Sequence, residues 1–174
     1  MKILFLSSEG LPYSKTGGLA DVVQALPKAL AEMGHEVAVL LPRYRGNKIA
    51  STLVSSVTIT MGDQLRFPSI AEGAAVAGVR YFFVVDRGFY DREQLYGEKG
   101  IDYPDNAERF TEFSRAAIEF AYPLFLLGFT IEVNRLRTFS AVELLLTRSL
   151  RTGRIFAHRG AHEETHLLQC LGWV

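Results

Sequence analysis

The sequence predicts an α/β fold with a parallel sheet and flanking helices, and three segments near its start carry this prediction. A nearly continuous apolar run at 2–8 has the length and character of a parallel strand buried on both faces. An amphipathic helix is predicted over 19–33, and a second apolar strand over 35–42. Because strand–helix–strand crossovers place their two strands in parallel, the three segments predict one β-α-β unit.

The helix prediction depends on the spacing of apolar side chains. They recur at three- and four-residue intervals and so form one stripe, which consists of Leu19, Val22, Val23, Leu26, Leu30 and Met33. Gly34 follows the last of them, and a glycine at this point typically ends a helix. The helix is therefore expected to end just before Gly34.

The middle of the chain predicts further elements of both kinds. The segment 51–67 alternates around a turn at Gly62 and Asp63, which indicates a hairpin. A buried strand is predicted at 78–86, then a polar loop rich in aromatic residues, then an amphipathic helix over 106–121. Farther on, 138–156 could form another helix.

Composition narrows the class of protein. The chain has 174 residues with 19 basic and 19 acidic side chains, so net charge gives no case for a nucleic-acid partner or an anionic membrane. The apolar segment 116–129 is shorter than the roughly 20 residues that span a bilayer. Glu119 and Pro123 interrupt it, so it is not expected to be a membrane anchor. Cys170 is the single cysteine, which favours a reducing compartment.

The junction between the first strand and the first helix is the candidate ligand site. It reads "PYSKTGGLADVV", with Lys15, Gly17 and Gly18 close to the helix start. Glycines let backbone N–H groups approach a phosphate, the helix dipole adds positive potential, and the lysine adds a mobile charge. These features predict a diphosphate cradle. The alternative is a tight turn beside a solvated lysine. The string is neither a Walker loop nor a G-x-G-x-x-G fingerprint.

A longer stretch of the chain resembles a known family. The string "SSEGLPYSKTGGLADVVQALPKALAEMGHEVAVLLPRY" and the later block "YGEKGIDYPDNAERF" are similar to the amino terminus of bacterial glycogen synthases and plant starch synthases. The resemblance covers residues 1–121. It implies the Rossmann-like amino-terminal domain of a GT-B glycosyltransferase, with the active site between two such domains.

The resemblance also implies a reaction. Glucose would pass from ADP-glucose to the non-reducing end of an α-1,4-glucan, with retention of configuration. Such enzymes handle phosphate charge with basic side chains and helix dipoles, so neither a metal nor a cofactor is implied.

Six residues take substrate-binding roles by this resemblance. Lys15 would bind ADP-glucose, and Gly17 and Gly18 would face its phosphates and sugar. Asp21 looks like the family's polar residue near the sugar, although a carboxylate also suits a helix amino terminus without any ligand. Glu9 and Tyr96 are candidates for contacts with the donor or the glucan, and the alternative for Tyr96 is an aromatic ring that packs its own loop.

Beyond residue 121 the resemblance ends. No lysine or aspartate occurs after residue 120, and the expected His-Asp-Trp-Gln-like block is missing. We therefore expect 1–121 to be the synthase-like portion and 122–174 a tail that is either divergent or translated out of frame, with the carboxyl-terminal GT-B domain absent. Without the second wall of the cleft, this chain alone is not expected to transfer glucose.

Two other functions stay open. The chain could be a non-catalytic module that binds an ADP-sugar or a glucan. More remotely, His162, Glu163 and His166 match the H-E-x-x-H pattern of zinc hydrolases, but no obvious third ligand follows, and an exposed helix end explains them as well. Since no transit segment precedes the first strand, we expect a bacterial cytoplasm.

Overall fold

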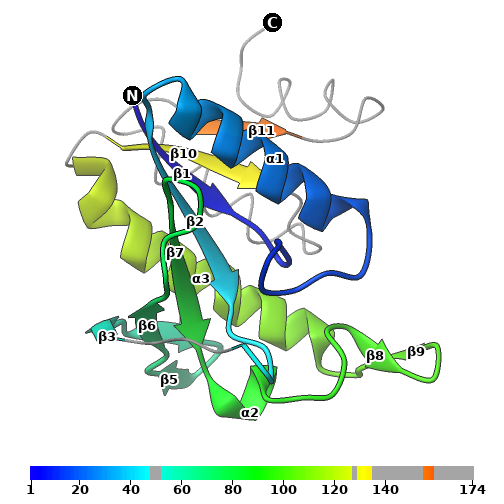
Figure 1. The fold of residues 1–174 in the computed structure, drawn as a ribbon. Helices are drawn as coiled ribbons and strands as arrows, with labels where there is room; N and C mark the ends of the chain where they lie inside the picture. The colour runs from blue at the N-terminus through cyan, green and yellow to red at the C-terminus, as the bar shows by residue number, and fades with distance from the viewer. Residues whose placement is uncertain (48–51, 127–128, 135–154, 159–174) are drawn as a thin grey trace, which may run out of the picture.

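The computed structural model describes residues 1–47, 52–126, 129–134 and 155–158 (Figure 1). In these ranges strands and helices follow in the order β1 (Lys2–Leu6), α1 (Gly18–Glu32), β2 (Glu36–Pro42), β3 (Thr52–Ser56), β4 (Ile59–Met61), β5 (Gln64–Arg66), β6 (Ser69–Glu72), β7 (Val79–Val85), α2 (Arg87–Tyr90), β8 (Gly97–Glu98), β9 (Ile101–Asp102), α3 (Asn106–Leu126), β10 (Phe129–Asn134) and β11 (Ile155–His158).

One large sheet organises the described residues. Its strand order is β11-β10-β1-β2-β7-β6-β3, and the first five of these strands run parallel. This part confirms the predicted parallel sheet. At the other end, β6 pairs antiparallel with β7, and β3 antiparallel with β6, so the sheet is mixed.

The chain changes direction across the sheet at β1. It proceeds from β1 to β2 and β7 on one side, and β10 then lies on the other side of β1. Strand order therefore reverses beside β1, and in open α/β sheets ligands bind at the carboxyl end of such a switch point. The loop that follows β1 lies there.

Several local predictions are confirmed. Helix α1 ends as expected, because Gly34 has a φ of 85° and the N–H of His35 donates to the carbonyl of Leu30 at 3.1 Å. A left-handed glycine with this reverse hydrogen bond caps helices in many proteins. Strands β4 and β5 form a hairpin with the predicted turn at Gly62.

Two local predictions need correction. The alternating segment 51–67 is not a single hairpin, because β3 pairs with β6 in the main sheet and only β4 and β5 pair with each other. The possible helix over 138–156 does not extend through Ile155, which begins β11 in parallel register with Ile131. In both places pairing with a strand distant in sequence overrides the local pattern.

The buried sheet strands alternate between two apolar layers. Leu4, Leu6, Leu40 and Phe82 pack in the layer that contains Phe113 and Ala117 of α3. Ile3, Phe5, Val39 and Phe83 pack in the layer that contains Val23 of α1. The two helices thus cover opposite faces, as Figure 1 shows, and this explains the unbroken apolar runs in the sequence.

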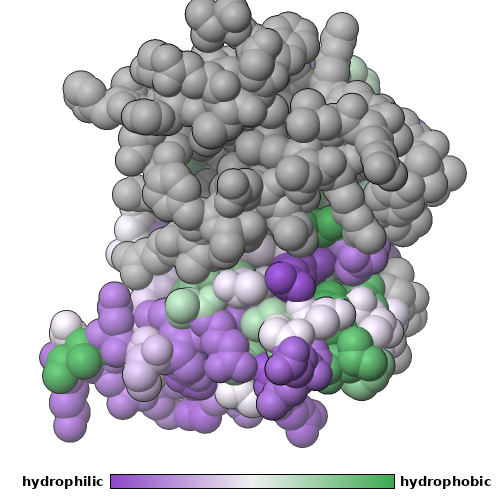
Figure 2. Space-filling model, turned by 180° about the vertical axis from the view of Figure 1, so that it is seen from behind, coloured by the Kyte–Doolittle hydropathy of each residue, from purple (hydrophilic) through white to green (hydrophobic). Residues whose placement is uncertain are grey.

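No helix among the described residues combines the length and apolar character needed to cross a bilayer. Seen from behind, the coloured part of the surface is mostly hydrophilic, with separate hydrophobic patches (Figure 2).

Candidate functional site

The candidate site is the loop between β1 and α1. Its first residue continues the sheet, since the N–H of Ser7 donates to the carbonyl of Leu40 at 3.1 Å. The loop then closes on itself, because Gly10 and Ser14 exchange backbone hydrogen bonds of 3.0 Å. The Leu11–Pro12 peptide bond within this turn is cis.

Close packing against α1 explains the glycine at position 10. A Cβ atom on Gly10 would lie 2.7 Å from Cγ1 of Val23, which is closer than nonbonded carbon atoms approach. The N–H of Leu11 also donates to the carbonyl of Ala20 at 3.4 Å. The loop therefore lies directly on the first turns of α1.

Two tyrosines fasten the loop from the other side. The Tyr81 hydroxyl donates to the carbonyl of Leu11 at 3.2 Å, and the Tyr13 hydroxyl donates to the carbonyl of Ala74 at 3.0 Å. Their rings pack with centroids 5.0 Å apart. Burial raises the pKa of both hydroxyls, so each keeps its proton and donates at neutral pH.

Glu9 lies inside the loop rather than in solvent. Its side chain is buried, and its Oε2 accepts hydrogen bonds from the backbone N–H of Thr16 at 2.7 Å and from the Thr16 hydroxyl at 2.6 Å. Hydrogen bonds to an ionised carboxylate are among the strong ones. Glu9 thus holds the residue that lies between Lys15 and the glycine pair. Its proposed contact with a substrate stays a prediction.

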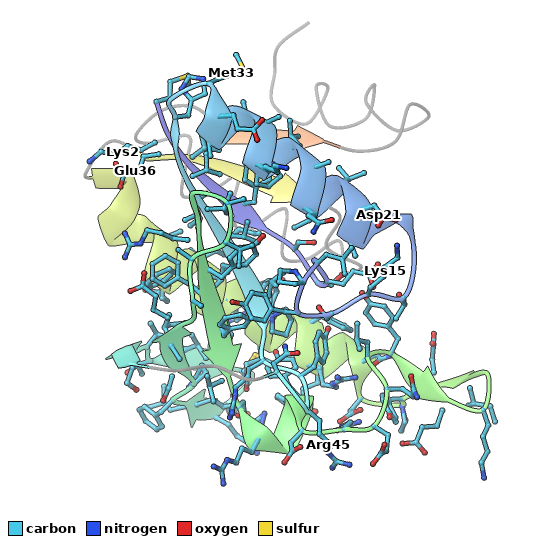
Figure 3. The ribbon with its side chains drawn as sticks, in the orientation of Figure 1. Lys2, Lys15, Asp21, Met33, Glu36 and Arg45 are labelled. Atoms are coloured by element: carbon cyan, nitrogen blue, oxygen red, sulfur yellow. The ribbon has the colours of Figure 1, made fainter. Side chains whose placement is uncertain are left out.

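Lys15 and Asp21 meet at the amino-terminal end of α1. Lys15 Nζ lies 2.6 Å from Asp21 Oδ1, and both side chains are about half exposed. Figure 3 shows the two labelled side chains pointing toward each other beside the start of the helix. The exposed lysine is therefore oriented toward the helix amino terminus by a partner one turn into the helix.

No packing contact among the described residues requires glycine at positions 17 and 18. A Cβ atom built on Gly17 or on Gly18 would meet nothing within 4 Å, and neither residue has a positive φ. Gly17 is the N-cap of α1, and no side chain caps the helix there. The first N–H groups of a helix need acceptors, and an anion can supply them. The geometry leaves room for an anion at the helix start, and the contact of Gly17 and Gly18 with a ligand stays a prediction.

Tyr96 joins the site through Ser8. Its hydroxyl lies 2.9 Å from Ser8 Oγ, and its ring packs on Phe110 with centroids 5.7 Å apart. Ser8 also accepts, at its carbonyl, a hydrogen bond from the Tyr44 hydroxyl at 2.9 Å. Tyr96 thus packs its loop and also contacts the β1 loop next to Glu9.

The structure brings all six predicted site residues to one end of the sheet, and it adds others. Sequence reasoning missed Ser8 and Thr16, although both lie within the quoted strings. It also gave no role to Asn106 and Arg109, which hold the segment that carries Tyr96. Their three-residue spacing at a helix start, which places both on one face, was the available signal.

The zinc alternative gains no support from the described residues. In that part of the chain no group of three or more His, Cys, Asp and Glu could hold a metal ion. His162, Glu163 and His166 lie outside the described residues.

Fold and site together define a class. A parallel sheet with an uncapped, glycine-rich helix start at its switch point is the arrangement of a Rossmann-like domain, in which ligands bind at the carboxyl ends of the strands. The family profile described as "Starch synthase catalytic domain" matches residues 2–134. The chain belongs to this family, which confirms the resemblance seen in the sequence.

Individual relatives agree with the family. The chain is 52% identical over 121 residues to a glycogen synthase of Koribacter versatilis (strain Ellin345), covering 68% of this chain and 25% of that protein. It is 41% identical over 124 residues to glycogen synthase 2 of Geobacter metallireducens (strain ATCC 53774 / DSM 7210 / GS-15), covering 69% and 25%. The chain therefore spans about a quarter of the length of these relatives.

A solved structure gives the same result for the fold. The catalytic domain of starch synthase IV from Arabidopsis thaliana, bound to ADP and acarbose, superposes with a TM-score of 0.69 at 29% identity. The match covers 90% of this chain and 33% of that one. The predicted fold class, a partial Rossmann-like domain of a GT-B glycosyltransferase, is confirmed.

Proposed function

We propose that this chain forms the donor-binding wall of a glycogen synthase, which transfers glucose from ADP-glucose to the non-reducing end of an α-1,4-glucan with retention. The observation that carries the proposal is the uncapped start of α1 at Gly17 and Gly18, with Lys15 beside it. The family membership and the ADP bound to the related starch synthase support it.

Each residue of the site has a distinct task in this proposal. The N–H groups that follow Gly17 donate to the diphosphate, and the absence of a Cβ at Gly17 and Gly18 lets the phosphate oxygens come close. The Lys15 ammonium neutralises part of the phosphate charge. Asp21 orients that ammonium and lies near the sugar, while Glu9 keeps the loop in place by binding Thr16.

The transfer step needs more than these groups. A departing diphosphate must be stabilised by charged groups placed around it, and one end of one sheet supplies only some of these groups. Transfer to the glucan is therefore proposed for the protein of which this domain is a part, and donor binding for the domain itself. The net charge of zero and the single cysteine agree with a bacterial cytoplasm.

Titration calorimetry with ADP as the probe tests the donor site. We expect Lys15→Ala to weaken ADP binding by about tenfold or more, because a charge-assisted contact is lost. Lys28→Ala is a matched control, since Lys28 is also exposed and pairs with a carboxylate of α1, Glu32, at 3.8 Å. Equal affinities of the two variants would refute the role of Lys15.

A glucan assay separates the enzyme from a binding module. Transfer of labelled glucose from ADP-glucose to a maltooligosaccharide supports a complete enzyme. For this chain alone the proposal expects ADP binding that Lys15→Ala weakens, without transfer. The alternative of a non-catalytic ADP-sugar module is supported if the whole protein that contains this domain also binds ADP without transferring glucose.

A further inference from the structure

Arg109 is an arginine buried among neutral oxygens. It lies in the first turn of α3 and is fully buried. Its Nε donates to the carbonyl of Phe89 at 2.7 Å, its Nη1 to Oδ1 of Asn106 at 2.7 Å, and its Nη2 to the carbonyl of Leu95 at 3.1 Å. Burial lowers the pKa of its guanidinium. Burying a cation in this way has a cost that only several well-made hydrogen bonds offset.

These contacts tie together both ends of one loop. Phe89 precedes the segment 91–105, Leu95 lies within it, and Asn106 follows it. Aromatic rings surround the guanidinium, with the ring centroids of Tyr103 and Phe110 at 5.2 and 5.4 Å from its central carbon. Arg109 therefore fixes the path of 91–105 at three points.

The fixed loop presents Tyr96 to the donor site. The carbonyl of Tyr96 accepts a hydrogen bond of 2.7 Å from Nδ2 of Asn106, whose Oδ1 in turn accepts from Arg109. The Tyr96 hydroxyl then meets Ser8 at 2.9 Å. The residue after Ser8 is Glu9, which holds Thr16 beside Lys15. A continuous series of hydrogen-bonded residues thus connects the start of α3 with the glycine loop.

We propose that Arg109 is a positioning residue for nucleotide binding, which acts by holding Tyr96 against Ser8 and thereby fixing the loop that carries Lys15. The proposal rests on the proposed function, because it assigns a role to Arg109 in the same donor site. Arg109 touches no substrate in it. A purely local role, in which Arg109 only stabilises 91–105, makes different predictions.

A double-mutant cycle with ADP as the probe tests the connection. Arg109→Lys keeps the charge but cannot donate in three fixed directions, so ADP affinity is expected to fall about fivefold or more. Tyr96→Phe removes only the hydroxyl that meets Ser8 and keeps the ring on Phe110. If Arg109 acts through this hydroxyl, the double variant binds ADP no more weakly than Arg109→Lys alone. If the losses in ADP affinity of the two single variants multiply in the double variant, the proposal is refuted.

Arg80→Lys is the matched control. Arg80 also stacks on an aromatic ring, that of Phe82 at 4.9 Å, and pairs with Glu72 at 2.8 Å, but it lies at the amino-terminal end of β7. Its replacement is expected to leave ADP affinity unchanged. A loss as large as that in Arg109→Lys would show general destabilisation and refute the proposal.

Amide hydrogen exchange provides a measurement that needs no ligand. Arg109→Lys and Tyr96→Phe are both expected to raise exchange at residues 14–18, and Tyr96→Phe serves alone if the arginine variant does not fold. Faster exchange confined to 91–105 would overturn the positioning role. If the unaltered chain binds no ADP, the proposed function fails, while the exchange data still decide whether Arg109 and Tyr96 fix the glycine loop.

Discussion

Glu112 of α3 carries a carboxyl group that the folded protein keeps neutral at physiological pH. Its side chain is fully buried, and neither carboxyl oxygen has a hydrogen-bond partner of normal geometry among the described residues. Burial, and after it the nearby carboxylate of Asp86, raise the pKa of this carboxyl from 4.5 to about 8. Arg66 Nη1 lies 3.3 Å from the carboxyl and opposes this shift without cancelling it.

The raised pKa makes the free energy of unfolding depend on pH. Below pH 4.5 the carboxyl is protonated in the folded and unfolded states alike, so this contribution to stability is complete. As the pH rises from 4.5 toward about 8, the unfolded chain releases a proton that the folded chain retains, and stability falls. Above about 8 both states are ionised and the loss stops. The full displacement corresponds to at most about 5 kcal/mol, and structural relaxation around Arg66 should reduce it to about 2–3 kcal/mol.

Glu112→Gln tests this reasoning, because an amide of the same shape does not titrate. Urea unfolding gives the free energy of unfolding of each protein between pH 5 and pH 8. Over this interval we expect the value for the wild type to fall by about 2–3 kcal/mol more than the value for the variant. Any effect of the amide itself on stability is the same at every pH, so the slope of stability against pH is the observable. Glu108→Gln, which removes a half-exposed carboxylate 3.6 Å from the same Arg66, should keep the wild-type slope. Parallel pH profiles for wild type and Glu112→Gln would refute the buried-acid argument.

The remaining predictions concern glycines and a buried hydroxyl. Gly10→Ala places a Cβ atom 2.7 Å from Cγ1 of Val23 and should lower the free energy of unfolding by about 1–3 kcal/mol in denaturant titrations. Gly18→Ala meets no atom within 4 Å and should keep or raise stability, by up to about 1 kcal/mol, while it weakens ADP binding; unchanged ADP affinity would count against a ligand role for Gly18. Tyr90→Phe removes a buried hydroxyl that donates to the Arg109 carbonyl at 2.8 Å, and it should lower the free energy of unfolding by about 1–2 kcal/mol. Tyr103→Phe, which removes an exposed hydroxyl, is the control and should lower it by about 0.5 kcal/mol or less.

The sequence was most informative where local rules and the tertiary fold agree. The β-α-β unit was readable because its strands are buried on both faces and its helix has one apolar stripe ending at Gly34. The turn at Gly62 followed from the same kind of local signal. Local patterns failed for β3 and for Ile155, where pairing with strands distant in sequence decides the structure.

The candidate site divides in the same way. Lys15, Gly17 and Gly18 could be selected from the sequence, because a phosphate-binding helix start needs residues of these types close together in the chain. The pairing of Glu9 with Thr16 is nearly as local, yet no sequence pattern distinguishes a carboxylate that holds a loop from one that contacts a substrate.

By itself, the sequence determined the family, the first β-α-β unit and the position of the glycine-rich helix start. Only the tertiary structure decided that the chain reverses its strand order at β1, and that Arg109 and Tyr96 connect α3 with the loop after that strand. The physical reason is how far apart in the sequence the interacting residues lie. Helix stripes, caps and glycine turns depend on residues a few positions apart, whereas Tyr96 and Ser8 are 88 positions apart and meet only because folding brings the ends of their elements to one edge of the sheet.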